Sequence, residues 1–454
     1  MQAVVVALDR LPGRLLGCCG AEQARTPAFD RLAADGLLFP LCFADDLADS
    51  ATDHAWWTGT RQLFRGGTSL EPKLRLIPAL HSHDVALHLL SDPRSRVPLP
   101  DEALWNREPL QSSDPASPAA ATSAELLAAQ VNRAVSLLSS GSSAEARVSQ
   151  LIWIQSAGCS ESAAVAEPAS QPDSADAADV EPGSAPGSDL NADRSVAQIQ
   201  AEVESLDRAL QPLVQWFTAI DPAEHEHPPL LLVTAAGGVR IPISIAGLDD
   251  TSARPLAADV VQTPLFLLVP GQWQNRRCLE FQQPMDLPPT LLEWFNVPFD
   301  SSRIEGRSLF EAARATELAA GEQPEPRQPR RIACTGRSDW RLAGLRTSRF
   351  YFTGSVSLPA RKPADATAEN DPENTISPEF GQFGEGQLFG KPEDQWDLHD
   401  IRREHLDLAE TFAAALGEFC SRLQHELPAP DPGDILPVEV LNGDPQPAEP
   451  PPGE

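Results

Sequence analysis

The sequence is short of basic residues. It has 35 Lys plus Arg against 65 Asp plus Glu, which gives a formal net charge of -30 over 454 residues. Lysine is the scarcer base and occurs at Lys73, Lys362 and Lys391. A protein that binds a nucleic acid needs a basic surface to meet the phosphates. The composition therefore excludes most nucleic-acid-binding functions, and we expect no nucleic-acid partner.

Long apolar runs and paired cysteines are also missing. The first apolar run covers residues 3–8 and is interrupted by Asp9 and Arg10, so it is too short for a signal peptide or a membrane span. We expect a cytoplasmic protein that does not contact a membrane. The seven cysteines are an odd number without C-x-x-C spacing, which argues against a disulfide framework and a zinc site.

Four segments differ in composition from the rest of the chain. Residues 108–124 and 161–194 are rich in Ala, Ser, Pro and Asp, with few large apolar residues to bury, and are predicted to be low-complexity inserts. Residues 361–387 are predicted to form a polar loop. Residues 427–454 hold nine Pro, six acids and no base, which predicts a disordered, acidic, Pro-rich tail.

Between these segments, strand and helix signals alternate. Strand-length apolar runs at 3–8, 151–154, 230–233 and 264–269 favour a mostly parallel sheet covered on both faces. Helices are predicted from the residues that typically start and stop them and from the spacing of apolar residues. One helix starts after Thr26, with Pro27 at its first position, and another starts at Asp286. A longer helix starts at Val196, and Pro212 within it should kink or restart it. An α/β domain over residues 1–325 is expected.

The C-terminal part differs from this pattern. Residues 345–352 alternate apolar and polar side chains like one half-exposed strand, and apolar residues at helical spacing over 408–423 predict a final amphipathic helix. We therefore expect a small α+β subdomain over residues 326–426.

Several motifs, in chain order, resemble those of the sulfatase family in the alkaline phosphatase superfamily. The N-terminal stretch Val5-Val6-Ala7-Leu8-Asp9, followed by Leu16-Gly17-Cys18-Cys19-Gly20, is similar to the sulfatase signature. The further matches are 26–36, Thr58-Gly59, 234–238, 264–271, 285–292, 304–309, 341–352 and 395–398. The resemblance implies an alkaline-phosphatase-like fold, with a central sheet between helices and a small C-terminal subdomain.

The same resemblance implies chemistry that can be checked residue by residue. Sulfatases hold calcium or magnesium with acidic and amide side chains, and attack sulfur with a Cys or Ser converted to formylglycine. In this chain Asp9 is the one remnant ligand position, and Arg10, Ala236 and Gly237 stand where the family has metal ligands. A guanidinium repels a cation and can replace its charge beside Asp9. We therefore expect no metal and no other cofactor.

The nucleophile motif is replaced as well. Counting back from Gly59 puts Asp49 at the nucleophile position, Asp53 at the family's Arg and His54 at its Ala. No formylglycine can form from Asp49, and with the register slipped by one Ser50 would be a plain nucleophile. The sulfate-binding Lys and His are replaced by Leu90 and Asp92.

Two functional hypotheses follow. Because nucleophile, metal and anion-binding groups act as a unit, their joint replacement favours a catalytically inactive pseudoenzyme with a binding or regulatory role. The alternative is an active sulfuric or phosphoric ester hydrolase with a rebuilt site, using calcium or magnesium and an acidic group. That group would comprise Asp9, Asp45, Asp46, Asp49, Asp53 and His54. We favour a solvated acidic loop for Asp45, Asp46 and Asp49.

Three further features have structural or interaction roles. His81, His83 and His88 lack a convincing third ligand, so we interpret them as ordinary histidines. Trp56 and Trp57 are interpreted as core residues, with stacking on a sugar as the alternative. The acidic insert or the Pro-rich tail could bind a protein partner whose identity the sequence does not give.

Overall fold

The computed structural model describes most of the chain. It covers residues 1–48, 54–65, 74–108, 121–140, 148–160, 195–242, 244–245, 248–249, 255–317, 329–339, 341–356, 386–429 and 431–442. Insert 161–194, most of insert 108–124 and most of loop 361–387 lie outside these residues, as does the expected domain boundary at residue 325.

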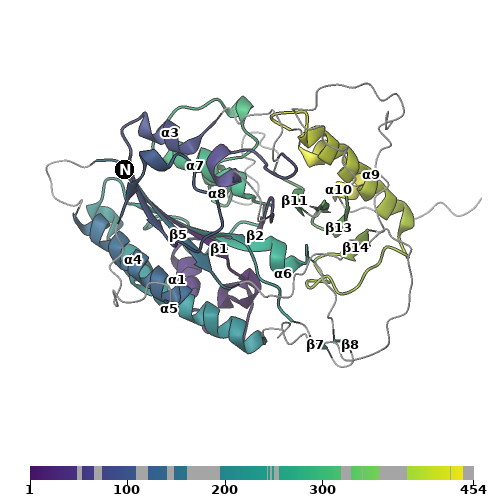
Figure 1. The fold of residues 1–454 in the computed structure, drawn as a ribbon, viewed down its shortest axis with the longest axis horizontal. Helices are drawn as coiled ribbons and strands as arrows, with labels where there is room; N and C mark the ends of the chain where they lie inside the picture. Colours follow the sequence, from purple (N-terminus) through teal and green to yellow (C-terminus); the bar gives the residue numbers. More distant parts are fainter. Residues whose placement is uncertain are drawn as a thin grey trace, which may run out of the picture.

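An eight-stranded sheet forms the centre of the larger part (Figure 1). The four apolar runs of the sequence become β1 (Gln2–Arg10), β5 (Gln150–Gly158), β6 (Leu230–Gly237) and β9 (Gln262–Leu268). The others are β2 (Leu37–Phe43), β3 (Ala86–Ser91), β4 (Asn106–Arg107) and β10 (Arg276–Arg277). The order is β10-β2-β9-β6-β1-β5-β3-β4, parallel except where β9 pairs antiparallel with β2 and β6. The expected mostly parallel sheet is confirmed.

Both faces of this sheet are buried, which explains why β1 is apolar at every position from residue 3 to residue 8. Val4 and Val6 pack with α1 (Pro27–Asp35), α4 (Ser123–Ser140) and α5 (Val196–Thr218). Ala3 and Val5 face the opposite way. There they pack with α2 (Ala55–Thr58), α3 (Leu76–His81), α7 (Leu287–Trp294) and α8 (Leu309–Ala315). Three short elements precede β9. They are the paired strands β7 (Ser244–Ile245) and β8 (Leu248–Asp249) and the helix α6 (Ala258–Val261).

The smaller part is a separate antiparallel sheet. Its strands are β11 (Ala333–Arg337), β12 (Leu342–Arg346), β13 (Phe350–Ser355) and β14 (Gln387–Gly390), in that order. The helix α9 (Leu406–Leu423) covers it and contributes Phe412, Leu416 and Phe419 to a core of its own. The expected small α+β subdomain and the amphipathic helix expected over 408–423 are confirmed.

Three expectations about elements need correction, one of them in part. Residues 345–352 form two strands rather than one, because Thr347 turns the chain by accepting bonds from the backbone N–H groups of Arg349 and Phe350. The helix α5 runs through Pro212 as one element, so it does not restart there, while a kink at Pro212 stays a prediction. Pro212 is on the exposed side, where water can satisfy the carbonyl that the proline leaves without a donor.

The third concerns the expected tail. Residues 428–429 and 431–442 are part of the folded molecule, with a 3-10 turn at Pro432–Asp434 and the helix α10 (Val438–Asn442). Leu436 is buried in the core of the subdomain. Asp431 pairs with Arg307 at 3.0 Å. Composition alone missed this segment because the many Pro and acidic residues of 427–454 outweigh the short apolar cluster at 435–441.

Candidate functional site

The parallel strands bring their carboxyl ends together at one edge of the sheet. Arg10 at the end of β1 stands opposite Gly158 of β5 and Gly237 of β6. Parallel sheets place binding sites at this edge. A cavity of about 260 Å³ opens there. It is lined by Asp9, Arg10, Asp46, Leu47, Ala48, His54, Arg94, Arg96, Val97, Pro98, Ser123, Ala157, Cys159, Ser160 and Ala236.

Asp9 is held by its neighbours. Its Oδ1 accepts a hydrogen bond from Ser95 Oγ at 2.7 Å, and its Oδ2 accepts one from the backbone N–H of Arg96 at 2.6 Å. The side chain is 7% exposed, and burial raises its pKa above the ordinary aspartate value, although these bonds and Arg10 oppose the shift. Both carboxylate oxygens of Asp9 are therefore already engaged.

Arg10 and Gly237 fit together sterically. The guanidinium Nη1 of Arg10 lies 2.6 Å from the position that a Cβ on residue 237 would take, and a methyl carbon of Leu47 lies 2.7 Å from it. A side chain at position 237 would thus overlap the guanidinium. The neighbouring Ala236 lines the cavity with a methyl group. Residues 10, 236 and 237 offer a cation and apolar surface, at the positions where the resemblance implies metal ligands in sulfatases.

The nucleophile region is described in part. Asp49, Ser50 and Asp53 lie outside the described residues. His54 caps α2, where its Nδ1 accepts a hydrogen bond from the N–H of Trp56 at 3.2 Å. Burial lowers the pKa of His54 to about 3, so the ring is neutral near pH 7 and carries its proton on Nε2.

Asp45 and Asp46 are not in a solvated loop, which corrects the interpretation favoured from sequence. Asp45 is buried and accepts a hydrogen bond from Gln62 N at 2.5 Å; burial raises its pKa to about 7. Asp46 accepts bonds from the backbone and hydroxyl of Ser338, which follows β11 of the small sheet. The pair therefore connects the loop after β2 to the subdomain, while Asp46 also lines the cavity.

The expected loss of the sulfate-binding cations is accompanied by arginines that the sequence reasoning missed. Leu90 is a core residue, and Asp92 is buried, where it accepts bonds from Arg94 at 2.9 to 3.1 Å. Arg94 and Arg96, in the loop after β3, line the cavity together with Arg10. The alternating arginines after an apolar strand were the available signal, because loops that follow parallel strands lie at the binding edge.

The remaining candidates have structural roles. His88 contacts Glu108 through Nδ1 at 2.8 Å, and His81 and His83 are exposed near the end of α3. Trp56 and Trp57 are fully buried against Trp153, with ring centroids 6.0 and 4.3 Å from it. The interpretation of the two tryptophans as core residues is confirmed. Their burial leaves no face for a sugar.

The described residues do not suit calcium or magnesium. Hard cations need several oxygen ligands. Nowhere in the described part of the chain do three His, Cys, Asp or Glu side chains come together in a way that could hold a metal ion. At the cavity, the guanidinium of Arg10 is close to Asp9. We therefore derive no chemistry that passes through a metal. Among the described helices, none is long and apolar enough to cross a membrane.

No family model matches the sequence, and no curated protein matches it. The fold, in contrast, is similar to several solved structures. The phosphonate monoester hydrolase of Agrobacterium radiobacter is 14% identical with a TM-score of 0.59, over 91% of this chain and 94% of that one. A putative sulfatase from Bacteroides thetaiotaomicron is 13% identical with a TM-score of 0.59, over 95% and 97%.

A third structure has the same degree of similarity over nearly the full length of both chains. It is the structure of a protein in complex with its substrate D-glucosamine-2-N,6-O-disulfate. That protein is 13% identical to this chain, with a TM-score of 0.59 over 99% of each chain. At these identities the similarity concerns the fold. This chain shares the fold of these solved structures, among them a putative sulfatase.

Proposed function

We propose that this chain is a sulfatase-like pseudoenzyme, whose cavity binds an anionic group without hydrolysing it. The single observation that carries the proposal is the position of the Arg10 guanidinium, which fills the space of a side chain at Gly237. A fixed cation there can balance an anion without coordinating water or polarising a leaving group, which are the tasks of a catalytic metal ion.

The charges around the cavity support the anion-binding part. Arg10, Arg94 and Arg96 line it, and guanidinium groups bind oxyanions with directed hydrogen bonds. Arg94 also pairs with the buried Asp92 at 3.0 Å. Asp9 is buried and hydrogen-bonded on both oxygens, which lessens its repulsion of an anion.

Turnover tests the pseudoenzyme part. Purified protein is assayed with aryl sulfate and aryl phosphate esters, with and without calcium or magnesium, beside Asp49→Ala. We expect no turnover above the Asp49→Ala background and no stabilisation by either metal ion. Metal-dependent turnover that disappears in Asp49→Ala would establish the rebuilt hydrolase instead.

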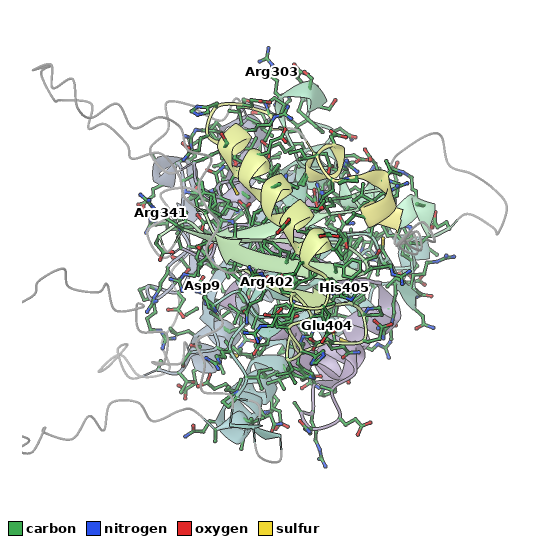
Figure 2. The ribbon with its side chains drawn as sticks, turned by 90° about the vertical axis from the view of Figure 1, so that its right-hand side faces the viewer. Asp9, Arg303, Arg341, Arg402, Glu404 and His405 are labelled. Carbon is green, nitrogen blue, oxygen red and sulfur yellow. The ribbon has the colours of Figure 1, made fainter. Side chains whose placement is uncertain are left out.

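Calorimetric titration with sodium sulfate tests the anion-binding part. We expect saturable binding by the wild type, and about tenfold weaker binding in Arg10→Gln and in Arg96→Gln, because each loses a charge-assisted hydrogen bond. Arg303→Gln is the control, since Arg303 lies at the periphery, away from Asp9 (Figure 2). Equal affinities in all four proteins would refute an anion site at this cavity.

A further inference from the structure

A second group of buried charges lies where the α/β domain meets the small subdomain, at residues that do not line the cavity around Asp9. We call it the seam cluster, and it consists of Arg14, Asp259, Arg346, Lys391 and Asp397. Figure 1 shows α6, which contains Asp259, beside the small sheet. The two parts touch there: the backbone N–H of Ala258 donates to Asp397 Oδ2 at 2.6 Å.

Three arginine donor atoms in the seam cluster lack acceptors in the described part of the chain, although Arg14 Nη2 donates to Gln262 Oε1 at 3.3 Å. Arg346 is 7% exposed, and its guanidinium lies over the rings of Phe43 and Tyr351, with centroids 5.5 and 5.7 Å away. Its Nε and Nη1 are buried and have no hydrogen-bond partner among the described residues. Arg14 lies over Trp396 at 4.9 Å, and its buried Nε is also without a partner there. Buried donors in folded proteins are nearly always paired, with protein, water or an ion.

The carboxylates of the seam cluster are engaged with other donors. Asp397 accepts bonds from Ala258 N and from Lys391 Nζ. Asp259 accepts one from the backbone N–H of Ile241 at 2.6 Å. The half-buried Asp394 nearby turns both oxygens to the backbone N–H groups at 398 and 399. These bonds leave the two arginines short of acceptors, although the carboxylates are close enough to contribute charge.

Burial lowers the pKa of all three cations of the seam cluster. Burial lowers the pKa of Arg346 to about 10 and that of Lys391 to about 8, and it lowers the pKa of Arg14. Asp397 opposes each of these shifts, while Arg346 further lowers the pKa of Lys391. Nearby negative charge thus compensates only part of the cost of burying three cations.

We propose that the seam cluster binds one small monovalent anion of the halide class, which accepts hydrogen bonds from Arg346 and Arg14. A monovalent ion fits because the cluster holds three cations and two fully buried carboxylates, Asp259 and Asp397. A weakly hydrated ion fits because aromatic rings surround the arginines, and stripping water from a multivalent oxyanion would cost more free energy. The anion would join the two parts of the fold through residues from both.

Thermal unfolding of the full chain tests the site. Melting temperatures are measured in potassium chloride, potassium bromide and potassium gluconate at one ionic strength, because gluconate is too large for a halide site. We expect chloride and bromide to raise the melting temperature of the wild type by about 2 °C at concentrations several times the dissociation constant. In Arg346→Met, which keeps an apolar chain between the two rings, this difference should vanish. In Arg31→Met, an exposed control on α1, it should remain.

Bromide crystallography gives an answer that does not depend on the variant folding. Crystals grown in potassium bromide should show an anomalous peak within hydrogen-bond distance of Arg346 Nε or Nη1. Water alone at that position, or a halide effect that persists in Arg346→Met, would overturn the proposal. Neither outcome bears on turnover or on sulfate binding at the cavity.

Discussion

Gly237 and Arg10 are fitted to each other in space. The glycine leaves the space that the guanidinium occupies, so the two residues should be coupled energetically. Sequence comparison with sulfatase motifs finds both replacements but not their contact, because they are more than 200 residues apart and meet through the pairing of β1 with β6.

A double-mutant cycle measures this coupling. Gly237→Ala in the wild type should lower the free energy of unfolding by about 1–3 kcal/mol, because the new methyl group overlaps Arg10 and Leu47. In an Arg10→Ala background the cost should fall by about 1 kcal/mol, as measured by urea unfolding. Gly390→Ala serves as a control, since its Cβ would make one ordinary contact at 3.8 Å. Additive effects of the two changes would refute the coupling.

The raised pKa of Asp45 predicts how the stability of the fold changes with pH. Its pKa is about 7 in the folded protein because of burial, against 3.8 for the free side chain. Between these values the folded state holds a proton that the unfolded state has released, so the contribution of Asp45 to stability is present below pH 3.8 and is lost as the pH rises to about 7.

Asp45→Asn should remove this dependence. The amide oxygen can still accept from Gln62 N, and the variant should be more stable than the wild type above pH 7, by an amount on the order of a few kcal/mol. Melting temperatures from pH 4 to pH 8 check this. Glu404→Gln is the matched control, because Glu404 is exposed on the surface (Figure 2). Parallel pH profiles for the wild type and Asp45→Asn would contradict the assignment.

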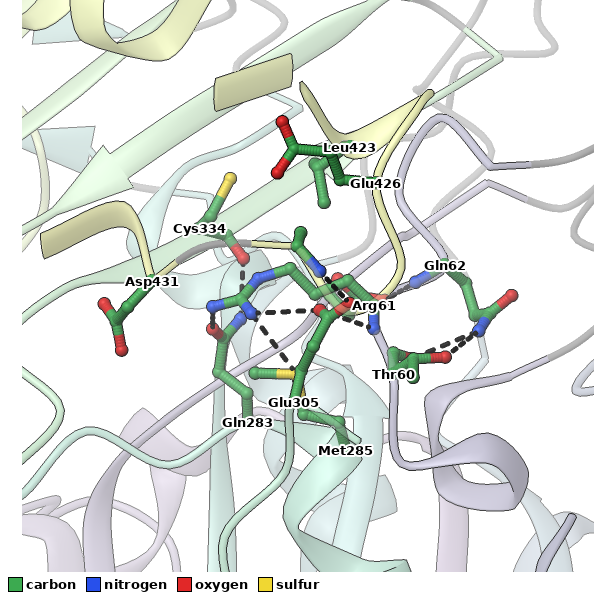
Figure 3. Close-up of polar contacts among 12 residues, drawn as sticks. Thr60, Arg61, Gln62, Gln283, Met285, Glu305, Cys334, Leu423, Glu426 and Asp431 are labelled. Carbon is green, nitrogen blue, oxygen red and sulfur yellow. Dashed lines mark hydrogen bonds and ion pairs between the residues drawn. The ribbon is translucent and has the colours of Figure 1, made fainter. Parts of the chain in front are cut away.

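At the scale of elements, a buried ion network joins the segment after α2 to the C-terminal part of the chain. Figure 3 shows Glu305 beside Arg61. Glu305 also pairs with Arg65 at 2.8 Å and accepts the N–H of Ala429 at 2.9 Å, with all three ionic side chains buried. Arg65 in turn donates to the carbonyls of Leu423, the last residue of α9, and of Glu426 just after it.

Glu305→Ala should therefore be strongly destabilising. It would leave two buried guanidinium groups without their carboxylate, a change that typically costs about 3–5 kcal/mol. Chemical denaturation measures the loss. Glu293→Ala, which breaks a half-exposed pair with Arg314 on α7 and α8, should cost less than about 1 kcal/mol. Equal losses in the two variants would show that the network contributes no more than a surface pair.

At the scale of the whole molecule, the sequence predicted the layers of the fold better than its connections. The strands β1, β5, β6 and β9 and the helices α1, α5 and α9 follow from apolar runs and punctuation, because each buries a long, regular surface. The turn at Thr347 has no glycine or proline to mark it. The buried positions of Asp45 and Asp46 depend on contacts with the distant residues Gln62 and Ser338, which no local pattern encodes.

The expected tail shows the same limit and provides the last prediction. A chain truncated after Asn442 keeps every described contact of the C-terminal segment. A chain truncated after Pro428 loses the bond from Ala429 to Glu305, the pair of Asp431 with Arg307 and the buried side chain of Leu436.

The shorter truncation product should therefore be less stable by about 3–5 kcal/mol, of which Leu436 contributes about 2 kcal/mol and the bond to the Glu305 carboxylate about 1.5–3 kcal/mol. Urea unfolding of the two products measures the difference. If both unfold at the same urea concentration, residues 429–442 contribute nothing to the fold, and the tail begins where the composition placed it. If they differ as expected, the segment fixes Glu305 and through it the arginines that connect the subdomain to the α/β domain.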